Sequence, residues 1–123
     1  MKRYLLAAVL SAAGLAQADD TLPRKQQLEV EVRILGTRLV KHEATIRHCK
    51  SNPASKGCAP VLEEVAQITA RVAVIVREYC PMVPGRTAIQ CDSQAGGWEV
   101  DAANYAEAAK LARAAEKKAK AKK

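Results

Sequence analysis

The sequence contains no phenylalanine, one tryptophan, three tyrosines and two histidines among its 123 residues. It therefore has few of the aromatic and imidazole groups that usually build catalytic pockets. It also has no phosphate-binding glycine loop, no serine nucleophile elbow and no zinc-protease motif. We predict a protein that is not an enzyme and that has no cofactor and no resident metal.

The chain also lacks an apolar run of the roughly 20 residues that a membrane-spanning helix needs. Its apolar run from Leu5 to Leu15 follows two basic residues and precedes the small residues Ala16-Gln17-Ala18. This order is typical of a Sec-type signal peptide, with cleavage expected before Asp19. We expect residues 1–18 to be removed and the mature chain to be soluble, in the periplasm or secreted.

Export affects how the four cysteines are interpreted, because disulfides persist outside the reducing cytosol. Their number suits two bridges. The sequence has no Cys-x-x-Cys pair, and this absence argues against thioredoxin-like chemistry and against covalent haem attachment. A metal site formed by His42, His48, Cys49 and Cys58 is the alternative. The two histidines are six residues apart, however, and would not share a helical face. We therefore expect structural disulfides.

Two segments carry a stripe of side chains at alternating steps of four and three residues. The stripes are Leu28, Val32, Leu35, Leu39, His42 and Ile46, and Val61, Val65, Ile68, Val72, Ile75 and Tyr79. This heptad-like spacing and the short connection between the segments predict an antiparallel helical hairpin with coiled-coil-like packing. Residues 28–34 also alternate as a strand would, but that pattern stops at Gly36 while the helical spacing continues.

The expected hairpin determines which cysteines can pair. Cys49 ends the first helix and Cys58 precedes the second, so both lie at one end. Cys80 ends the second helix on the order of 30 Å away at 1.5 Å per residue. A disulfide requires α-carbons within about 7 Å of each other. We predict the bridges Cys49–Cys58 and Cys80–Cys91.

Three polar residues of the hairpin have both a functional and a structural interpretation. His42 lies on the first stripe, where it could set the register or respond to pH, but a satisfied histidine at the edge of the seam is the simpler interpretation. Glu63 and Glu64 follow Pro60, which we expect to begin the second helix. We expect the two carboxylates to stabilise its first turn and not to form a catalytic pair.

The chain after residue 80 divides into a loop and a helix. Residues 81–100 hold two prolines and three glycines and are expected to form a loop. Within it, Trp98 is either an exposed partner contact or a cover for the Cys80–Cys91 bridge. Asp101 is expected to cap an Ala/Lys-rich helix over residues 101–115, with residues 117–123 frayed. The predicted fold class is therefore all-α, a disulfide-stapled antiparallel hairpin plus a C-terminal helix.

Positive charge is concentrated at the C-terminus. Residues 19–105, the expected hairpin domain, hold eleven basic and eleven acidic side chains, whereas residues 106–123 hold seven and two. The basic residues of this predicted tail are Lys110, Arg113, Lys117, Lys118, Lys120, Lys122 and Lys123. Such a segment binds polyanions through charge without sequence-specific nucleic-acid recognition, or it serves only solubility. It has little apolar surface, so we expect its removal to leave the fold intact.

These features predict a small exported protein that binds an unidentified envelope protein through its helical surface. Inhibitor, immunity, chaperone and secretion-accessory roles fit equally. The alternative is a protein that associates with a polyanion or a membrane surface through its basic tail. Both apolar stripes are wider than a two-helix seam can bury, so the third segment or a second copy, in a homodimer, is expected to cover them.

Overall fold

The computed structural model describes residues 22–122, so the predicted signal peptide (residues 1–18) and Lys123 lie outside the described residues. The elements are α2 (Arg24–Lys41), α3 (Glu43–Ser51), α4 (Cys58–Tyr79), the short 3-10 helix η2 (Cys80–Met82) and α5 (Ala88–Ala121). This part of the chain contains no strand. The predicted all-α class is therefore confirmed, and the strand interpretation of residues 28–34 is wrong.

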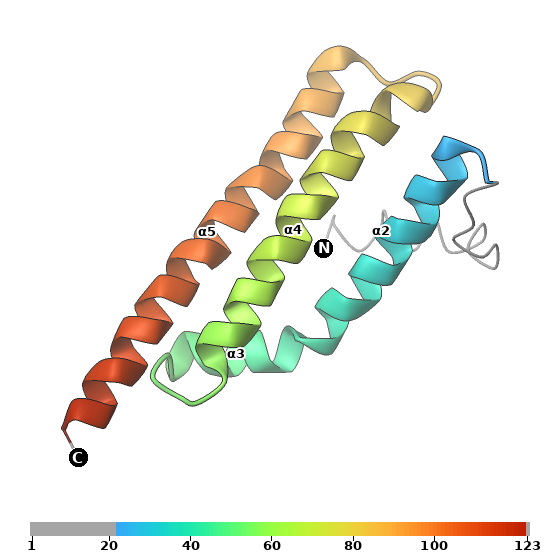
Figure 1. Cartoon of the computed structure of the whole chain (residues 1–123). Coiled ribbons are helices and arrows are strands. Elements are labelled where there is room, and N and C mark those ends of the chain that lie inside the picture. The colour runs from blue at the N-terminus through green and yellow to red at the C-terminus, as the bar shows by residue number, and fades with distance from the viewer. Residues whose placement is uncertain (1–21, 123) are drawn as a thin grey trace.

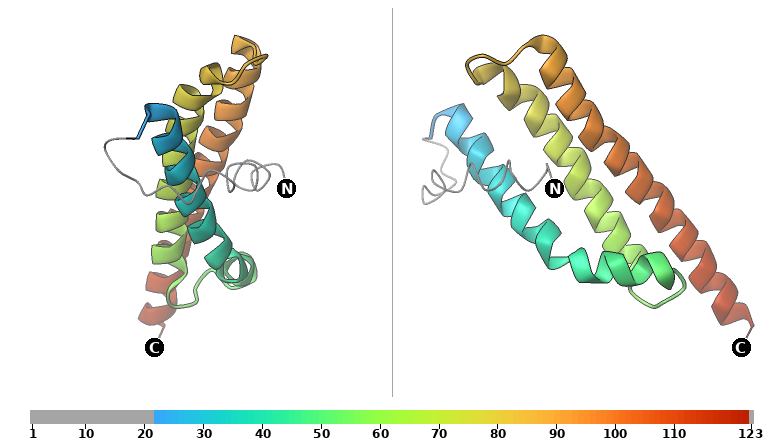
Figure 2. Two further views of the ribbon diagram at one scale, coloured as in Figure 1. Left: turned by 90° about the vertical axis from the view of Figure 1, so that its right-hand side faces the viewer. Right: turned by 180° about the vertical axis from the view of Figure 1, so that it is seen from behind.

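The central element is α4, with α2 on one side of it and α5 on the other (Figure 1). Both α2 and α5 run antiparallel to α4, and α4 and α5 lie side by side in each view (Figures 1 and 2). The predicted hairpin of the first two stripes is thus present. The third segment is a full-length partner of α4.

The two predicted stripes form the main core. In α2 the buried stripe residues are Leu28, Val32, Leu35 and Leu39, and in α4 they are Val65, Ile68, Val72 and Ile75. The wider apolar surface of α4 is covered by α5. Ala73 and Val76 share the main core with Trp98 of α5, and Leu62 shares a smaller core with Ala112 of α5.

The first predicted helix is bent, which the apolar spacing did not predict. His42 separates α2 from α3, with φ −90° and ψ −2°, and its N–H donates to the carbonyl of Leu39 at 3.1 Å. This tightened turn redirects the chain, so that α3 passes toward the beginning of α4 (Figure 1). A bend of this kind leaves the phase of the stripe unchanged, and spacing therefore cannot reveal it.

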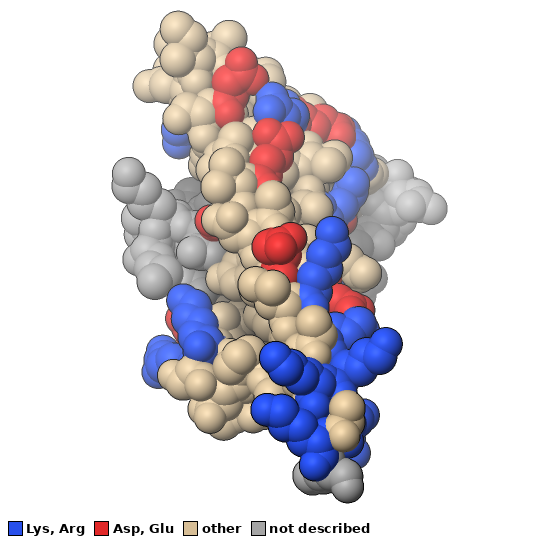
Figure 3. All heavy atoms as spheres, turned by 90° about the vertical axis from the view of Figure 1, so that its left-hand side faces the viewer, with Lys and Arg blue, Asp and Glu red and all other residues tan. Residues whose placement is uncertain are grey.

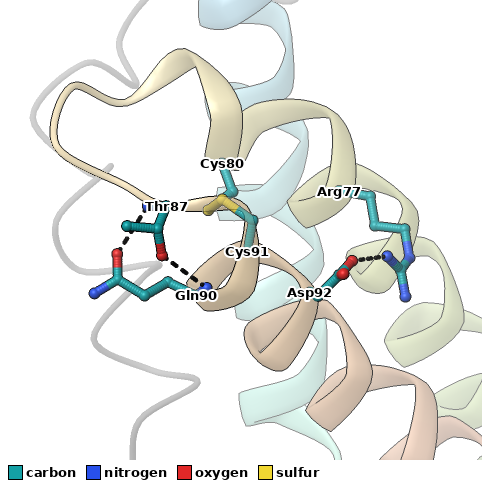
Figure 4. Close-up of a disulfide and its surroundings, with 6 residues drawn as sticks. All are labelled: Arg77, Cys80, Thr87, Gln90, Cys91 and Asp92. Carbon is teal, nitrogen blue, oxygen red and sulfur yellow. Dashed lines mark hydrogen bonds and ion pairs between the residues drawn. A yellow bond between two sulfur atoms is a disulfide. The ribbon is translucent and has the colours of Figure 1, made fainter.

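The expected loop over residues 81–100 is also wrong, because α5 begins at Ala88. Thr87 caps the helix: its hydroxyl accepts from the N–H of Gln90 at 3.1 Å, and the Gln90 side chain accepts from the N–H of Thr87 at 2.9 Å (Figure 4). This capping box satisfies two N–H groups that the helix itself leaves unpaired. Asp101 is consequently inside a helix and not at its start, and the helix continues through the region expected to fray.

The beginning of α4 differs from the expectation as well. The helix starts at Cys58, after Gly57 with a positive φ of 93°. Pro60 is therefore the third helical residue, and no acidic residue lies in the first turn. Glu63 and Glu64 do not serve the helix dipole there, and both instead pair with side chains of other helices.

Both predicted disulfides are confirmed. Cys49–Cys58 joins the last turn of α3 to the first residue of α4, and Cys80–Cys91 joins η2 to the first turn of α5 (Figure 4). The α-carbons are 5.6 Å apart in each pair. These bridges indicate an oxidising, extracytoplasmic location. Among the helices of residues 22–122, none combines the length and apolarity needed to cross a bilayer.

Candidate anion-binding surface

The C-terminal half of α5 lies against the turn between α3 and α4, at one end of the molecule (Figures 1 and 2). A small apolar core joins these segments, and it consists of Cys49, Cys58, Ala59, Leu62, Ala109 and Ala112. Ala109 and Ala112 are 2% and 1% exposed. The helix crosses residues 105–106 without a break. The expectation that residues 106–115 contribute little to the core is therefore wrong.

Basic side chains gather at this end of the molecule. Residues 38–64 and 107–122 together hold eleven basic and five acidic side chains, whereas residues 22–37 and 65–106 hold six of each. Figure 3 shows Lys and Arg clustered at the C-terminal end of α5, with a second basic group at the same end of the molecule. We define the basic end by its exposed side chains: Arg47, Lys50, Lys56, Lys110, Lys117, Lys118, Lys120 and Lys122.

Few charges of the basic end are neutralised by neighbouring carboxylates. Lys120 lies 3.8 Å from Glu116, one helical turn away. The nearby arginines Arg113 and Arg38, which are not part of the basic end, pair with carboxylates of α4. Within residues 22–122, no ion pair involves Lys117, Lys118 or Lys122. The positive charge of the basic end is therefore directed largely to solvent.

Three of the six basic side chains in the other half of the molecule are held by carboxylates. Arg71 binds Glu31 through two hydrogen bonds of 2.6 and 2.8 Å, and Arg24 binds Glu78 at 2.5 and 2.8 Å. Arg77 reaches both carboxylates of α5 that face it, at 2.8 Å from Asp92 (Figure 4) and 2.8 Å from Glu99. The arginine hydrogen bonds hold the pKa of Glu31, Glu78 and Glu99 below the ordinary value.

Among the predicted contact residues, Trp98 is buried in the core, whereas the lysines are exposed. Trp98 is 7% exposed and shares the main core with Cys80 and Cys91. It therefore lies in the interior beside the second bridge and not on the surface that a partner would contact. Arg113 is engaged with Glu63 of α4.

The residues proposed for the alternative metal site do not come together as a ligand set. Cys49 and Cys58 are bonded to each other, and His48 lies 3.2 Å from the hydroxyl of Ser55. His42 pairs with Glu64, and this contact lowers the pKa of the carboxyl group. No cluster of ligating side chains suited to a metal occurs in the described part of the chain. His42 is thus a partly buried, hydrogen-bonded residue at the bend.

A shallow pocket lies on the opposite half of the molecule, near the Cys80–Cys91 bridge. Its lining consists of Val32, Ile75, Val76, Tyr79, Cys80, Val83, Arg86 and Gln94. The Tyr79 hydroxyl donates to Glu29 at 2.9 Å, and burial raises the pKa of Tyr79 to about 12. This lining supplies no serine, histidine or acidic residue for acid–base or nucleophilic chemistry.

Sequence reasoning missed Arg47, Lys50 and Lys56 as members of the basic end. Their charges were hidden in the neutral total for residues 19–105, because the acidic residues that balance them lie mostly in the other half of the fold. The available signal was the run of Arg47, Lys50 and Lys56 around the first cysteine pair, close in sequence to the bend. Comparison of the chain with known protein families, well-characterised proteins and solved structures found no match.

Proposed function

We propose that this chain is an exported, non-enzymatic binding protein whose basic end attaches to phosphate-rich anionic surfaces or polymers. The observation that carries the proposal is the convergence of two basic segments, residues 47–56 and residues 110–122, at one end of the bundle. Local positive potential attracts polyanions, and a rigid helix presents its lysines without first having to order them. Lysine and arginine are both suited to phosphate oxygens.

The expected mode of binding is attachment at a surface and not insertion. Beyond Leu111 the helix consists only of alanine and charged residues, so it carries no bulky apolar side chain. Deep burial in a bilayer requires a large apolar face, so the basic end would contact headgroups or polymer phosphates only. Binding should therefore weaken steeply with salt, since the Debye length falls to about 8 Å at physiological ionic strength.

The cellular setting belongs to the same proposal. The sequence of residues 1–18 supports Sec-dependent export, and the disulfides suit the periplasm or the cell exterior. Phosphate groups there occur on phospholipid surfaces and on acidic polymers. Attachment to either would bring the remainder of the bundle, including the exposed side of α5, to that surface.

Three matched variants of the mature chain test the proposal, and each removes three positive charges. The first replaces Lys118, Lys120 and Lys122 by glutamine. The second replaces Arg47, Lys50 and Lys56 by glutamine. The control replaces Lys25, Arg33 and Arg86 by glutamine, and these three residues lie in the other half of the fold. Binding is measured by co-sedimentation with phosphatidylglycerol vesicles and, separately, by titration with inorganic polyphosphate.

We expect each of the first two variants to lose at least about tenfold in affinity, and the control to change little. Vesicle binding without polyphosphate binding would identify a lipid surface as the source of phosphate, and the reverse would identify a polymer. An equal loss in all three variants would show that only net charge matters. Absence of saturable binding by the unmodified chain would leave the C-terminal lysines a solubilising role only.

A further inference from the structure

The side of α5 that faces away from α4 carries a line of large apolar residues. Ile89, Val100 and Leu111 are 81%, 60% and 62% exposed. Successive members are eleven residues apart, which is close to three helical turns, so they share one side of the helix. The buried residues of α5, among them Ala95 and Ala109, lie on the opposite side. This outer side is not covered by any described element.

Two glycines lie beside this line, and the fold of a single chain does not require them. Gly96 and Gly97 are in the interior of α5, and a Cβ atom built on either one meets nothing within 4 Å. Glycine inside a helix costs about 1 kcal/mol relative to alanine. A close approach by another backbone is a common reason to retain glycine at such a position.

Charge is separated along the same helix. Residues 88–107 contain four acidic and no basic side chains, whereas residues 108–122 contain six basic and one acidic. Asp92, Glu99, Lys110 and Lys117 follow one another at steps of seven, eleven and seven residues, and these steps keep them on one flank of the helix. Arg77 already binds both carboxylates, which leaves the Arg77–Asp92–Glu99 group with one net negative charge. The Asp92 side chain remains 78% exposed.

We propose that two copies of the chain associate through the outer sides of α5, antiparallel and related by a two-fold axis. Asp92 and Glu99 are separated by the same number of residues as Lys110 and Lys117. One antiparallel register therefore places Asp92 opposite Lys117 of the partner subunit and Glu99 opposite Lys110 of the partner subunit. Matching flanks meet in an antiparallel helix pair, and the two-fold axis repeats both contacts.

The same register also brings together Val100, Leu111 and the glycines. It places Leu111 of each copy opposite position 98 of the other, within two residues of both Gly96 and Gly97, so a large side chain lies beside the space that the glycines leave. A parallel pair would instead place the lysine-rich C-terminal ends of the two helices side by side, which is unfavourable. The second copy is thus the partner that fits both the shape and the charge of this surface.

This inference rests on the apolar line, the glycines and the charge spacing of α5, and not on the proposed anion binding. The interface uses Lys110 and Lys117, and Lys118, seven residues after Leu111, lies on the same side of α5. Arg47, Lys50 and Lys56 of the basic end belong to other segments of the chain and stay exposed. The antiparallel arrangement would place the two basic ends at opposite ends of the dimer.

Sedimentation velocity of the oxidised mature chain, without added polyanion, tests the dimer across micromolar concentrations. We expect a reversible dimer that weakens with salt. Val100→Glu should weaken it at least about tenfold, because the substitution buries an unpaired charge in the interface, close to Leu111 of the partner subunit. Gly96→Gln together with Gly97→Gln should give a more stable monomer and a weaker dimer. Val74→Glu, at a 53% exposed residue of α4, is the matched control and should leave the dimer intact.

Circular dichroism and thermal unfolding of each variant establish that its monomer is folded. A monomeric mature chain at all concentrations would overturn the proposal. So would a dimer that Val74→Glu disrupts and Val100→Glu does not. The opposite effects of the glycine replacements on monomer stability and on dimer affinity could not arise from general destabilisation.

Discussion

Arg113, in the C-terminal half of α5, donates to the carboxylate of Glu63 in α4. This contact ties the segment that was expected to be a free tail to the central helix of the bundle. Below it, Ala109 and Ala112 are buried with the Cys49–Cys58 bridge. The C-terminal half of α5 therefore packs into the folded core through its alanines and carries the lysines of the basic end on its exposed sides.

Truncation after Tyr105 should destabilise the protein. It removes the cover from Leu62, which is 5% exposed, and exposing a buried leucine costs about 1.5–3 kcal/mol. We expect a lower free energy of unfolding in urea by at least this amount. Truncation after Glu116 is the control, because it retains Ala109, Ala112 and Arg113, and it should leave stability nearly unchanged. Equal stability of the two truncations would show that α5 packs only through its first half.

Replacement of Gly96 or Gly97 by alanine should stabilise the monomer. Both residues are helical, and the added methyl group meets nothing within 4 Å. Each substitution should therefore add about 0.5–1 kcal/mol to the free energy of unfolding. Gly57→Ala is the contrasting variant: its φ of 93° strains a residue with a side chain, and stability should fall. A loss of stability in Gly97→Ala would mean that α5 is not helical there.

Loss of the Tyr79 hydroxyl should destabilise the fold at neutral pH. Glu29 is 9% exposed, and Tyr79→Phe removes a hydrogen bond to its carboxylate. A hydrogen bond to a charged group contributes about 1.5–3 kcal/mol. Tyr105→Phe is the matched control, since its hydroxyl makes no hydrogen bond within residues 22–122, and it should have a smaller effect in urea unfolding.

The same tyrosine predicts a loss of stability at alkaline pH. The pKa of Tyr79 is raised by burial from 10 in the unfolded chain to about 12 in the fold. Between these values the unfolded chain releases a proton that the native state retains, so stability falls as pH rises. The difference in unfolding free energy between the wild type and Tyr79→Phe should therefore shrink across this window. A difference that is constant with pH would contradict the shift.

Acid should weaken the contact between α2 and α4. The Arg71 hydrogen bond holds the pKa of Glu31 below its ordinary value of 4.5. The resulting stabilisation is present above about pH 4.5 and is lost as pH falls through the lower, folded-state pKa. Because both side chains are about 40% exposed, Glu31→Gln should cost less than about 1 kcal/mol at neutral pH. Its effect should vanish in acid, as followed by urea unfolding.

The main core could be predicted from the sequence because its signal is local and periodic. The stripes from Leu28 to Leu39 and from Val65 to Ile75 identify buried helix faces directly. The disulfides followed from the same pattern, since two helices of known length place each cysteine at a definite end. The distance limit between α-carbons then left one pairing.

The extent of α5 could not be predicted in the same way, because its local signals conflict. Gly96 and Gly97 argue against a helix, and the buried side is mostly alanine, which gives a weak apolar period. The Thr87-x-x-Gln90 capping box was a readable start signal that the neighbouring prolines and glycines obscured. The bend at His42 and the grouping of Lys50 with Lys118 depend on tertiary structure, and no sequence period records them.

The most direct test of the proposed function is an NMR titration of the oxidised mature chain with short inorganic polyphosphate, followed through the backbone amides. The two-segment basic end predicts saturable shifts in residues 47–58 and in residues 110–122 together, with a common dissociation constant, and little change at Lys25 or Arg86. Shifts confined to residues 117–122, or spread equally over both halves of the molecule, would contradict it.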